Sequence, residues 1–325
     1  MAENTKIEWC DSTWNPWIGC TKIAPACDHC YAADWSKRYG RAEWGNHPRE
    51  RTGDATWNAA RKWQAAAPDF FEKHGRRRRV FCASLADVFD NQVPDEWRAD
   101  LWALIRECPD LDFLMLTKRP QNIEKMLPAF WDEVRGHVWL GTTVEDQEHA
   151  DANIPHLLKH DSAVRFISVE PMLGPIDLDR IVVPYGFHFS ALHESSWGGS
   201  GMPSRLHALN WVIAGGESGP HARPSHPDWF LDLRDQCATA GVPFLFKQWG
   251  EWAPGENATA RVPVAGEMGA WLREEQPVDW HIRRVGRAEA EEGHRDDEPE
   301  LWRLGKKQAG RRLDGVLHDG FPIAA

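Results

Sequence analysis

The feature that most constrains the fold of this chain is a short apolar run that recurs six times after residue 79. Each run is rich in β-branched or aromatic residues and ends in a charged residue, and a helical stretch often follows it. The runs cover residues 80–87, 113–118, 138–145, 164–170, 211–217 and 242–247. Near-continuous apolar strands are typical of a parallel sheet that is covered on both faces. With a seventh strand near residues 13–18, they predict an α/β fold with a complete or partial parallel (β/α) barrel.

The segments between these runs predict the crossover helices that parallel strands require. Residues 94–108 place apolar side chains near a 3.6-residue period, residues 146–158 and 227–240 are similar, and Pro120 can open a helix towards residue 127. Alternating strands and helices indicate right-handed βαβ units. A doubly wound open sheet is the main alternative. We expect the barrel to span residues 1–252, with insertions near 41–79 and 186–208, and residues 253–325 to form a C-terminal appendage.

Charge and hydropathy exclude several classes of protein. Lys plus Arg is 38 and Asp plus Glu is 49, so the formal charge is 38 − 49 = −11. This excludes the uniformly basic surface of a general duplex-DNA binder but leaves room for local basic groups, at residues 76–79, 306–307 and 311–312. No run approaches the ~20 apolar residues of a transmembrane helix, and the N-terminus lacks a signal-peptide pattern. We therefore predict a cytoplasmic protein.

Three of the seven cysteines, Cys20, Cys27 and Cys30, form the strongest motif in the chain, with the spacing C-x6-C-x2-C. The short second gap lets two thiolates reach one metal centre, and the first cysteine is near enough in sequence to complete the set. Three local thiolates suit an iron–sulfur cluster with one open iron, or a zinc site with His29 as fourth ligand. Free thiols are the simplest alternative. The other four cysteines, at positions 10, 82, 108 and 237, are expected to pack in the core.

A charged residue stands at the carboxyl end of each predicted strand: Asp87, Lys118, Glu145, Glu170, Glu217 and Lys247. In a β/α barrel these ends meet at one mouth, where active sites form, and the cysteine motif follows the first strand. The acidic residues are candidate cofactor contacts, and Lys118, Glu170 and Lys247 are candidate catalytic or substrate contacts. Gly215 and Gly216 would let backbone approach a ligand closely. The 19 Trp residues suit either core packing or stacking on a planar ligand, and Trp249 is a further candidate substrate contact.

Several blocks of the sequence resemble a phage and prophage family of three-Cys-motif proteins of uncharacterised function. The blocks are TWNPWIGC at 13–20, CDHCYA at 27–32, LTKRP at 116–120, SVEPMLGP at 168–175, GGESGP at 215–220, FKQWG at 246–250 and GKKQAGR at 305–311. Members of that family are regarded as similar to radical S-adenosylmethionine enzymes. The usual spacing in those enzymes is C-x3-C-x2-C, whereas six residues fill the first gap here.

The resemblance implies a [4Fe-4S] cluster on Cys20, Cys27 and Cys30, with S-adenosylmethionine as cofactor. Such an enzyme cleaves S-adenosylmethionine to a 5′-deoxyadenosyl radical and takes its electron from a reductant such as flavodoxin or ferredoxin. The phage context and local basic groups favour a nucleobase, nucleotide or nucleic acid as the substrate to be modified or repaired. Two other classes stay open: a zinc-dependent hydrolase or nuclease, and a non-enzymatic binding module stapled by a metal.

Overall fold

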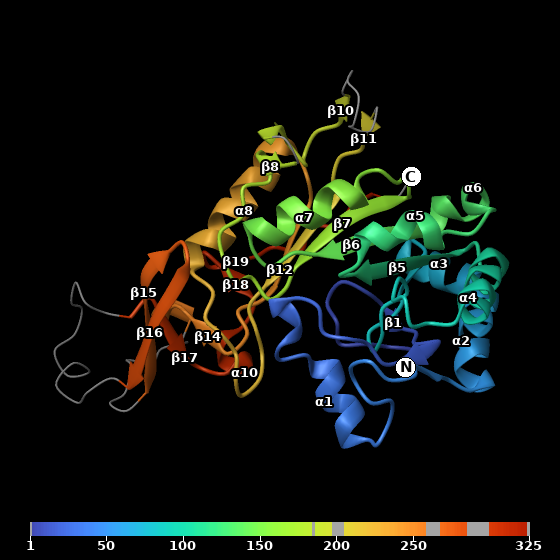
Figure 1. Ribbon diagram of the computed structural model, residues 1–325, viewed down its shortest axis with the longest axis horizontal. Helices are drawn as coiled ribbons and strands as arrows, with labels where there is room; N and C mark the ends of the chain where they lie inside the picture. Colours follow the sequence, from blue (N-terminus) through green and yellow to red (C-terminus); the bar gives the residue numbers. More distant parts are fainter. Residues whose placement is uncertain (1, 184–185, 197–204, 258–266, 285–298, 324–325) are drawn as a thin grey trace.

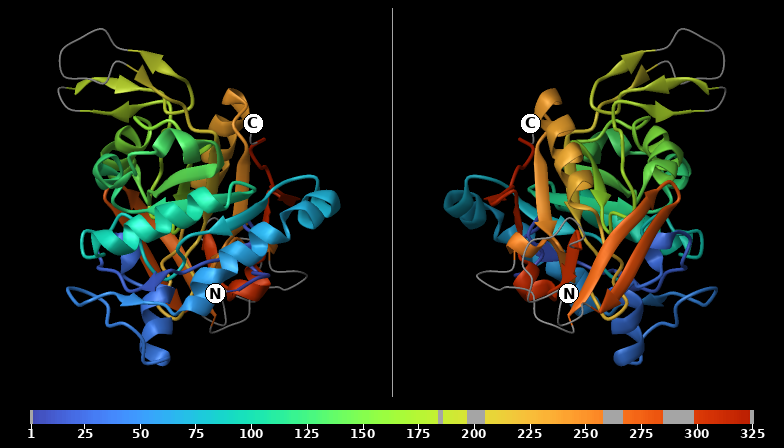
Figure 2. Two further views of the ribbon diagram at one scale, coloured as in Figure 1. Left: turned by 90° about the vertical axis from the view of Figure 1, so that its right-hand side faces the viewer. Right: turned by 90° about the vertical axis from the view of Figure 1, so that its left-hand side faces the viewer.

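A seven-stranded parallel sheet, curled into a half barrel, forms the centre of the computed structural model (Figures 1 and 2). Its strands run β1–β4–β5–β6–β7–β12–β13, in the order in which the chain visits them. They are β1 (Ser12–Thr13), β4 (Arg78–Phe81), β5 (Leu111–Thr117), β6 (Val138–Thr143), β7 (Val164–Val169), β12 (Trp211–Gly215) and β13 (Phe244–Gln248). A doubly wound sheet reverses its strand order at a switch point, and this sheet does not. The partial barrel is thereby confirmed, and the open-sheet alternative is wrong.

The structure describes residues 2–183, 186–196, 205–257, 267–284 and 299–323. Within them, the strand predicted near residues 13–18 is split in two, because only β1 joins the barrel sheet, parallel to β4. Residues Trp17–Ile18 form β2, which pairs antiparallel with β3 (Glu50–Arg51). No helix in the described part of the chain is long and apolar enough to span a bilayer.

The predicted crossover helices are confirmed within one or two residues. They are α4 (Asp95–Glu107), α7 (Gln147–Leu157) and α8 (Pro227–Ala240), while the segment after Pro120 forms η2 (Pro120–Asn122) and α5 (Ile123–Met126). Side chains of α4, α7 and α8 share one buried cluster with the outward-facing side chains of the sheet. Before α8, the described residues also form the helices η1 (Pro25–Cys27), α1 (Tyr31–Arg38), α2 (Asp54–Ala65), α3 (Ala67–His74), α6 (Trp131–Val134) and η3 (Arg135–His137).

Aromatic side chains fill the inner face of the half barrel near the amino ends of the strands. The Trp211 ring is central: its centroid lies 5.9 Å from Trp139, 6.5 Å from Trp9 and 5.2 Å from Phe321. These rings belong to a second buried cluster that also includes Phe166 and Leu245. Tryptophan therefore serves as core filler here, because large rings can close a barrel interior that smaller side chains would leave empty.

Two segments extend from the barrel. Before β12, the chain forms the short strands β8 (Ile181–Val182), β9 (His188–Phe189), β10 (Ser195–Ser196) and β11 (Arg205–Leu206). In Figures 1 and 2, β10 and β11 lie at the opposite end of the molecule from α1. Part of the insertion predicted at 186–208, residues 197–204, lies outside the described residues.

The C-terminal part forms a second, antiparallel sheet in the order β14–β17–β15–β16. Its strands are β14 (Trp252–Ala253), β15 (Met268–Glu275), β16 (Val278–Arg284) and β17 (Leu301–Arg303), with η5 (Gly255–Asn257) between β14 and β15. The chain continues through α10 (Lys306–Ala309), β18 (Arg312–Leu313) and β19 (Val316–Leu317). It then returns to the barrel, where Asp319 bridges to Leu245 of β13.

Candidate active site at the barrel mouth

The two-residue period of a strand places the predicted charged residues on the inner face of the sheet. Leu245 packs in the inner aromatic cluster, and Lys247 lies two residues further along β13. Phe166 of β7 belongs to the same cluster, and Glu170 follows it at another even spacing, four residues further along the chain. Side chains at even spacing point to the same face of a strand. The inner face therefore changes from aromatic near the amino ends to charged at the carboxyl ends.

Lys247 and Glu170 meet across this mouth as an ion pair. The Lys247 Nζ atom lies 2.9 Å from Glu170 Oε1, and the Ser168 hydroxyl lies 3.3 Å from Glu170 Oε2. Burial by itself would lower the pKa of Lys247, but the neighbouring carboxylate outweighs it and holds the pKa above the ordinary value. The Lys247 ammonium group therefore stays charged at neutral pH. Lys118, the other predicted basic contact, donates to the Thr143 hydroxyl at 3.2 Å.

The cysteine loop, which we define as residues 20–30, lies across the same mouth and is held by strand-end carboxylates. The backbone N–H of Ala26 donates to Glu145 Oε1 at 3.1 Å. Arg223 forms a bridge: its guanidinium lies 2.7 Å from Glu217 Oε1 and 3.2 Å from Asp28 Oδ2. The structure thus brings the three-Cys motif and two of the predicted acidic residues to one place.

His29 contacts a carboxylate of this mouth as well. Its Nδ1 atom lies 3.2 Å from Glu217 Oε2. Burial acts to raise the pKa of Glu217, but hydrogen bonds from Arg223 and from His29 outweigh it and hold that pKa below the ordinary value. Because a histidine that ligates a metal commonly donates its other ring N–H to a carboxylate, this contact is compatible with His29 as a zinc ligand, which stays a prediction.

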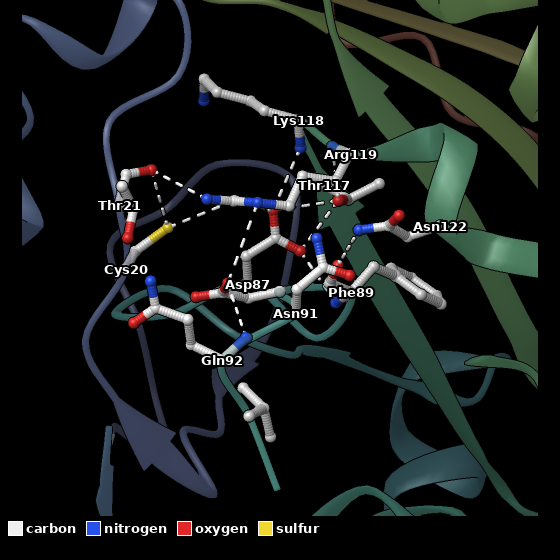
Figure 3. A network of polar contacts seen from close by, with 12 residues as sticks. Cys20, Thr21, Asp87, Phe89, Asn91, Gln92, Thr117, Lys118, Arg119 and Asn122 are labelled. Atoms are coloured by element: carbon white, nitrogen blue, oxygen red, sulfur yellow. Dashed lines mark hydrogen bonds and ion pairs between the residues drawn. The ribbon is translucent and has the colours of Figure 1, made fainter. Parts of the chain in front are cut away.

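A buried network anchors the first cysteine of the loop (Figure 3). Arg119 lies among Cys20, Thr21 and Asp87, and its guanidinium is 3.5 Å from Cys20 Sγ, 2.9 Å from the Thr21 carbonyl oxygen and 3.0 Å from Asp87 Oδ2. Burial raises the pKa of the Cys20 thiol to about 11; Asp87 adds to this rise and Arg119 opposes it. The thiol is therefore protonated at neutral pH in this conformation.

A second arginine extends the network on its other side. Arg49 donates to the Asp90 carboxylate at 2.8 Å and to the Thr21 hydroxyl at 2.8 Å, and Asp90 also faces Arg119 at 3.9 Å. Sequence reasoning missed Arg49, Arg119 and Arg223. The signal for Arg119 was present, since it follows Lys118 at the end of a predicted strand. Arg49 and Arg223 carried no such signal.

The Asp87 carboxylate accepts its hydrogen bonds from groups of the protein itself. Its carboxylate accepts hydrogen bonds from the Thr117 hydroxyl at 2.8 Å, from the backbone N–H of Phe89 at 2.9 Å and from Arg119. It is 5% exposed. Its contacts make it a support for the Cys20 anchor, and its predicted role as a direct cofactor contact stays a prediction.

Glu145 differs from Asp87, because one of its oxygens is unused. The residue is fully buried, and its Oε2 atom has no hydrogen-bond partner among the described residues. Burial raises the pKa of Glu145 above the ordinary value, opposed by the hydrogen bond from Ala26. A buried acceptor without a partner costs about 1–3 kcal/mol and is unusual away from a binding site.

Gly215, the last residue of β12, and Gly216, which follows it, make room for the protein's own atoms. A Cβ atom on Gly216 would lie 1.9 Å from the Trp249 carbonyl oxygen, and one on Gly215 would lie 2.8 Å from Glu170 Oε1. Trp249 itself is 3% exposed, and its indole N–H donates to the Arg312 carbonyl oxygen at 2.7 Å. The prediction that Trp249 contacts substrate is wrong, because the ring packs in the core against Phe230.

The donor set of the cysteine loop fits an iron–sulfur cluster in type and in location. All three thiols are free, and Cys20 and Cys30 are partly exposed. The arrangement does not fit as it stands: no group of three or more His, Cys, Asp or Glu side chains in the described part of the chain is placed to hold a metal ion. Ligation would require the three thiols to turn towards one another. The other four cysteines are buried, as predicted.

Comparison with known proteins gives a family and one remote structural likeness. The structure is similar to a spore photoproduct lyase variant solved with bound AdoMet and dinucleoside spore photoproduct, at 11% identity and a TM-score of 0.36, over 73% of this chain and 77% of the other. No curated protein matches the sequence. A family described as "Protein of unknown function (DUF5131)" matches residues 4–322, and the chain belongs to that family.

Proposed function

We propose that this protein is a radical S-adenosylmethionine enzyme that acts on a nucleobase, nucleotide or nucleic acid. Cys20, Cys27 and Cys30 would hold a [4Fe-4S] cluster, reduced by a partner such as flavodoxin or ferredoxin. When bound, the cluster would supply the electron that cleaves S-adenosylmethionine. The observation that carries this proposal is the seating of the three-Cys loop on Glu145 and Glu217, at the carboxyl ends of the barrel strands.

The residues around the mouth suit the binding of a charged, polar cofactor. We assign Glu145, Glu217 and the Gly215–Gly216 backbone to this surface, with Asp87 as its support. The free Oε2 of Glu145 can accept a hydrogen bond from an ammonium or hydroxyl group. Glu170 and Lys247 hold opposite charges at 2.9 Å, and with Lys118 they are placed to orient a polar substrate. Such preorganised charges act strongly where water is excluded.

The way the loop is anchored argues against a purely structural metal site. A stapling metal is needed where the protein cannot hold a loop by its own contacts. Here Arg119, Arg223 and Glu145 hold the loop by the protein's own contacts, from the segments that follow β5, β12 and β6. The cysteines are then available for a cofactor with another task.

The test is anaerobic reconstitution of the full chain with iron and sulfide, followed by reduction in the presence of S-adenosylmethionine. We expect about four iron atoms per chain and release of 5′-deoxyadenosine. A colourless protein that instead binds one zinc ion, or an intact cluster that releases no 5′-deoxyadenosine, would overturn the proposal.

Replacement of a single cysteine separates a cofactor site from a staple. In Cys30→Ala we expect loss of the reconstituted iron and of 5′-deoxyadenosine, with an unchanged urea unfolding midpoint for the metal-free protein. The matched control is Cys108→Ala, which removes a core thiol at the end of α4 and should keep its iron. Unfolding of the wild-type chain when its metal is removed would favour the structural role.

A further inference from the structure

The C-terminal segment lines an open cavity that the proposed chemistry does not use. It has a volume of about 950 Å³ and is lined by residues 304–312 together with Asn257, Gly315 and Leu317. This volume lies near the upper end of the range, about 300–1,000 Å³, that small-molecule sites occupy. Gly305 and Gly310, with φ of 82° and 73°, bracket the single turn of α10 and fold the segment around the cavity.

Four basic residues line this cavity, and three of them are unpaired. Lys306, Lys307 and Arg312 are exposed and have no carboxylate partner among the described residues, although Arg312 Nη1 donates to the Gly315 carbonyl oxygen at 2.8 Å. Arg311 is only partly available, because it pairs with Asp319 and donates to the Lys247 carbonyl oxygen at 3.0 Å. In a chain of net charge −11, unpaired cations gathered in one hollow make a local attraction for anions.

The other basic run of the sequence, residues 76–79, serves the fold instead. Arg76 pairs with Asp11 at 2.6 Å, Arg77 lies 3.7 Å from Asp112, and Arg78 stacks on Phe70 with its guanidinium 4.4 Å from the ring centre. A phosphate-binding role, which the sequence left open for both runs, is therefore better supported for the C-terminal one.

The cavity adjoins the barrel mouth through direct backbone contacts. Just after β13, the backbone N–H of Trp249 donates to the Gly310 carbonyl oxygen at 3.2 Å. On the other side, the N–H of Gly305 donates to the Glu251 carbonyl at 3.0 Å, and the N–H of Glu251 donates to the Glu217 carbonyl at 2.9 Å. The segment that lines the cavity is thus joined through Glu251 to the loop that carries Glu217.

We infer that this cavity binds the phosphate groups of a nucleotide or nucleic acid and so holds the substrate beside the mouth. Lysine ammonium groups bind phosphate as point charges, and an arginine fork binds it through two parallel hydrogen bonds. As a statement about substrate, the inference rests on the proposed function. The binding itself needs neither iron nor S-adenosylmethionine.

The experiment measures binding of a fluorescently labelled single-stranded DNA of about ten nucleotides to the full metal-free chain, by anisotropy at several salt concentrations. Each phosphate contact with a single strand contributes about 0.7 to the slope of log K against log salt. Lys306→Ala/Lys307→Ala should therefore reduce the slope by about 1.4. If affinities converge near 1 M salt, binding at about 0.1 M becomes about 25-fold weaker.

The matched control is Lys62→Ala/Lys73→Ala, which removes the same charge from two exposed lysines of α2 and α3. In Figure 1 these helices lie on the far side of the molecule from α10. We expect the control to bind like the wild type. Equal losses in both double variants, no loss in Lys306→Ala/Lys307→Ala, or no binding by the wild type would each overturn the inference.

A nucleoside monophosphate as competitor distinguishes the two sources of phosphate. Displacement of the labelled DNA at millimolar concentration supports a nucleotide site, and displacement only by unlabelled oligonucleotide supports a nucleic-acid site. Failure of this binding inference can be distinguished from failure of the proposed enzymatic activity. A chain that releases 5′-deoxyadenosine but binds DNA without using Lys306 and Lys307 loses only this inference.

Discussion

Removal of the Arg119 guanidinium tests whether the barrel itself holds the cysteine loop. In Arg119→Gln, the side chain becomes too short to span Asp87 and the loop. The substitution deletes the 3.0 Å contact with Asp87 and the 2.9 Å hydrogen bond to the Thr21 carbonyl oxygen. It also leaves Cys20 without its cationic neighbour.

The expected loss of unfolding free energy follows from the burial of the Arg119–Asp87 pair. The side chains of Arg119 and Asp87 are each 7% exposed, and removal of one partner from such a pair costs about 3–5 kcal/mol. Asp87 keeps its hydrogen bonds from Thr117 and Phe89, so its charge remains partly compensated. We therefore expect a loss at the lower end of that range, about 3 kcal/mol of unfolding free energy.

Urea unfolding of the metal-free chain, followed by tryptophan fluorescence, measures the loss. The control is Arg61→Gln, which breaks a pair with Glu107 whose side chains are 47% and 52% exposed. Exposed pairs contribute about 0.2–1 kcal/mol. If Arg119→Gln loses no more than Arg61→Gln does, the buried network does not anchor the loop and the reasoning is refuted.

Two further predictions concern packing and pH. Gly216→Ala should destabilise the fold by about 1–3 kcal/mol or prevent folding, because its Cβ would meet the Trp249 carbonyl at 1.9 Å, whereas Gly136→Ala has open space and should change the urea midpoint little. The 2.7 Å contact with Asp146 holds the pKa of His149 above the ordinary value. This contact stabilises the fold fully below about pH 6.5, and the stabilisation disappears as pH rises through the folded pKa. His149→Gln should therefore lower the urea midpoint clearly near pH 5.5 and much less near pH 9, and equal losses at both would contradict the assignment.

The barrel could be predicted from the sequence because its signals are local. The run at 164–170 is mostly β-branched or aromatic and ends in Glu170, and this pattern indicates a buried parallel strand whose end faces the mouth. The period of two then places Glu170 and Lys247 on one face, as the structure shows. Trp249 lies only two residues beyond Lys247 and was misassigned, because no local pattern tells a core indole from one that lines a site.

What the sequence by itself determined was the place of the strands along the chain, the cysteine motif and the charges at the strand ends, since each depends on residues that are neighbours in the chain. The tertiary structure alone decided which groups hold the loop. Arg119 reaches Cys20 across 99 positions, and Arg223 reaches Pro25 across 198. Such contacts form only when the closing sheet brings distant strand ends together, so no local pattern encodes them.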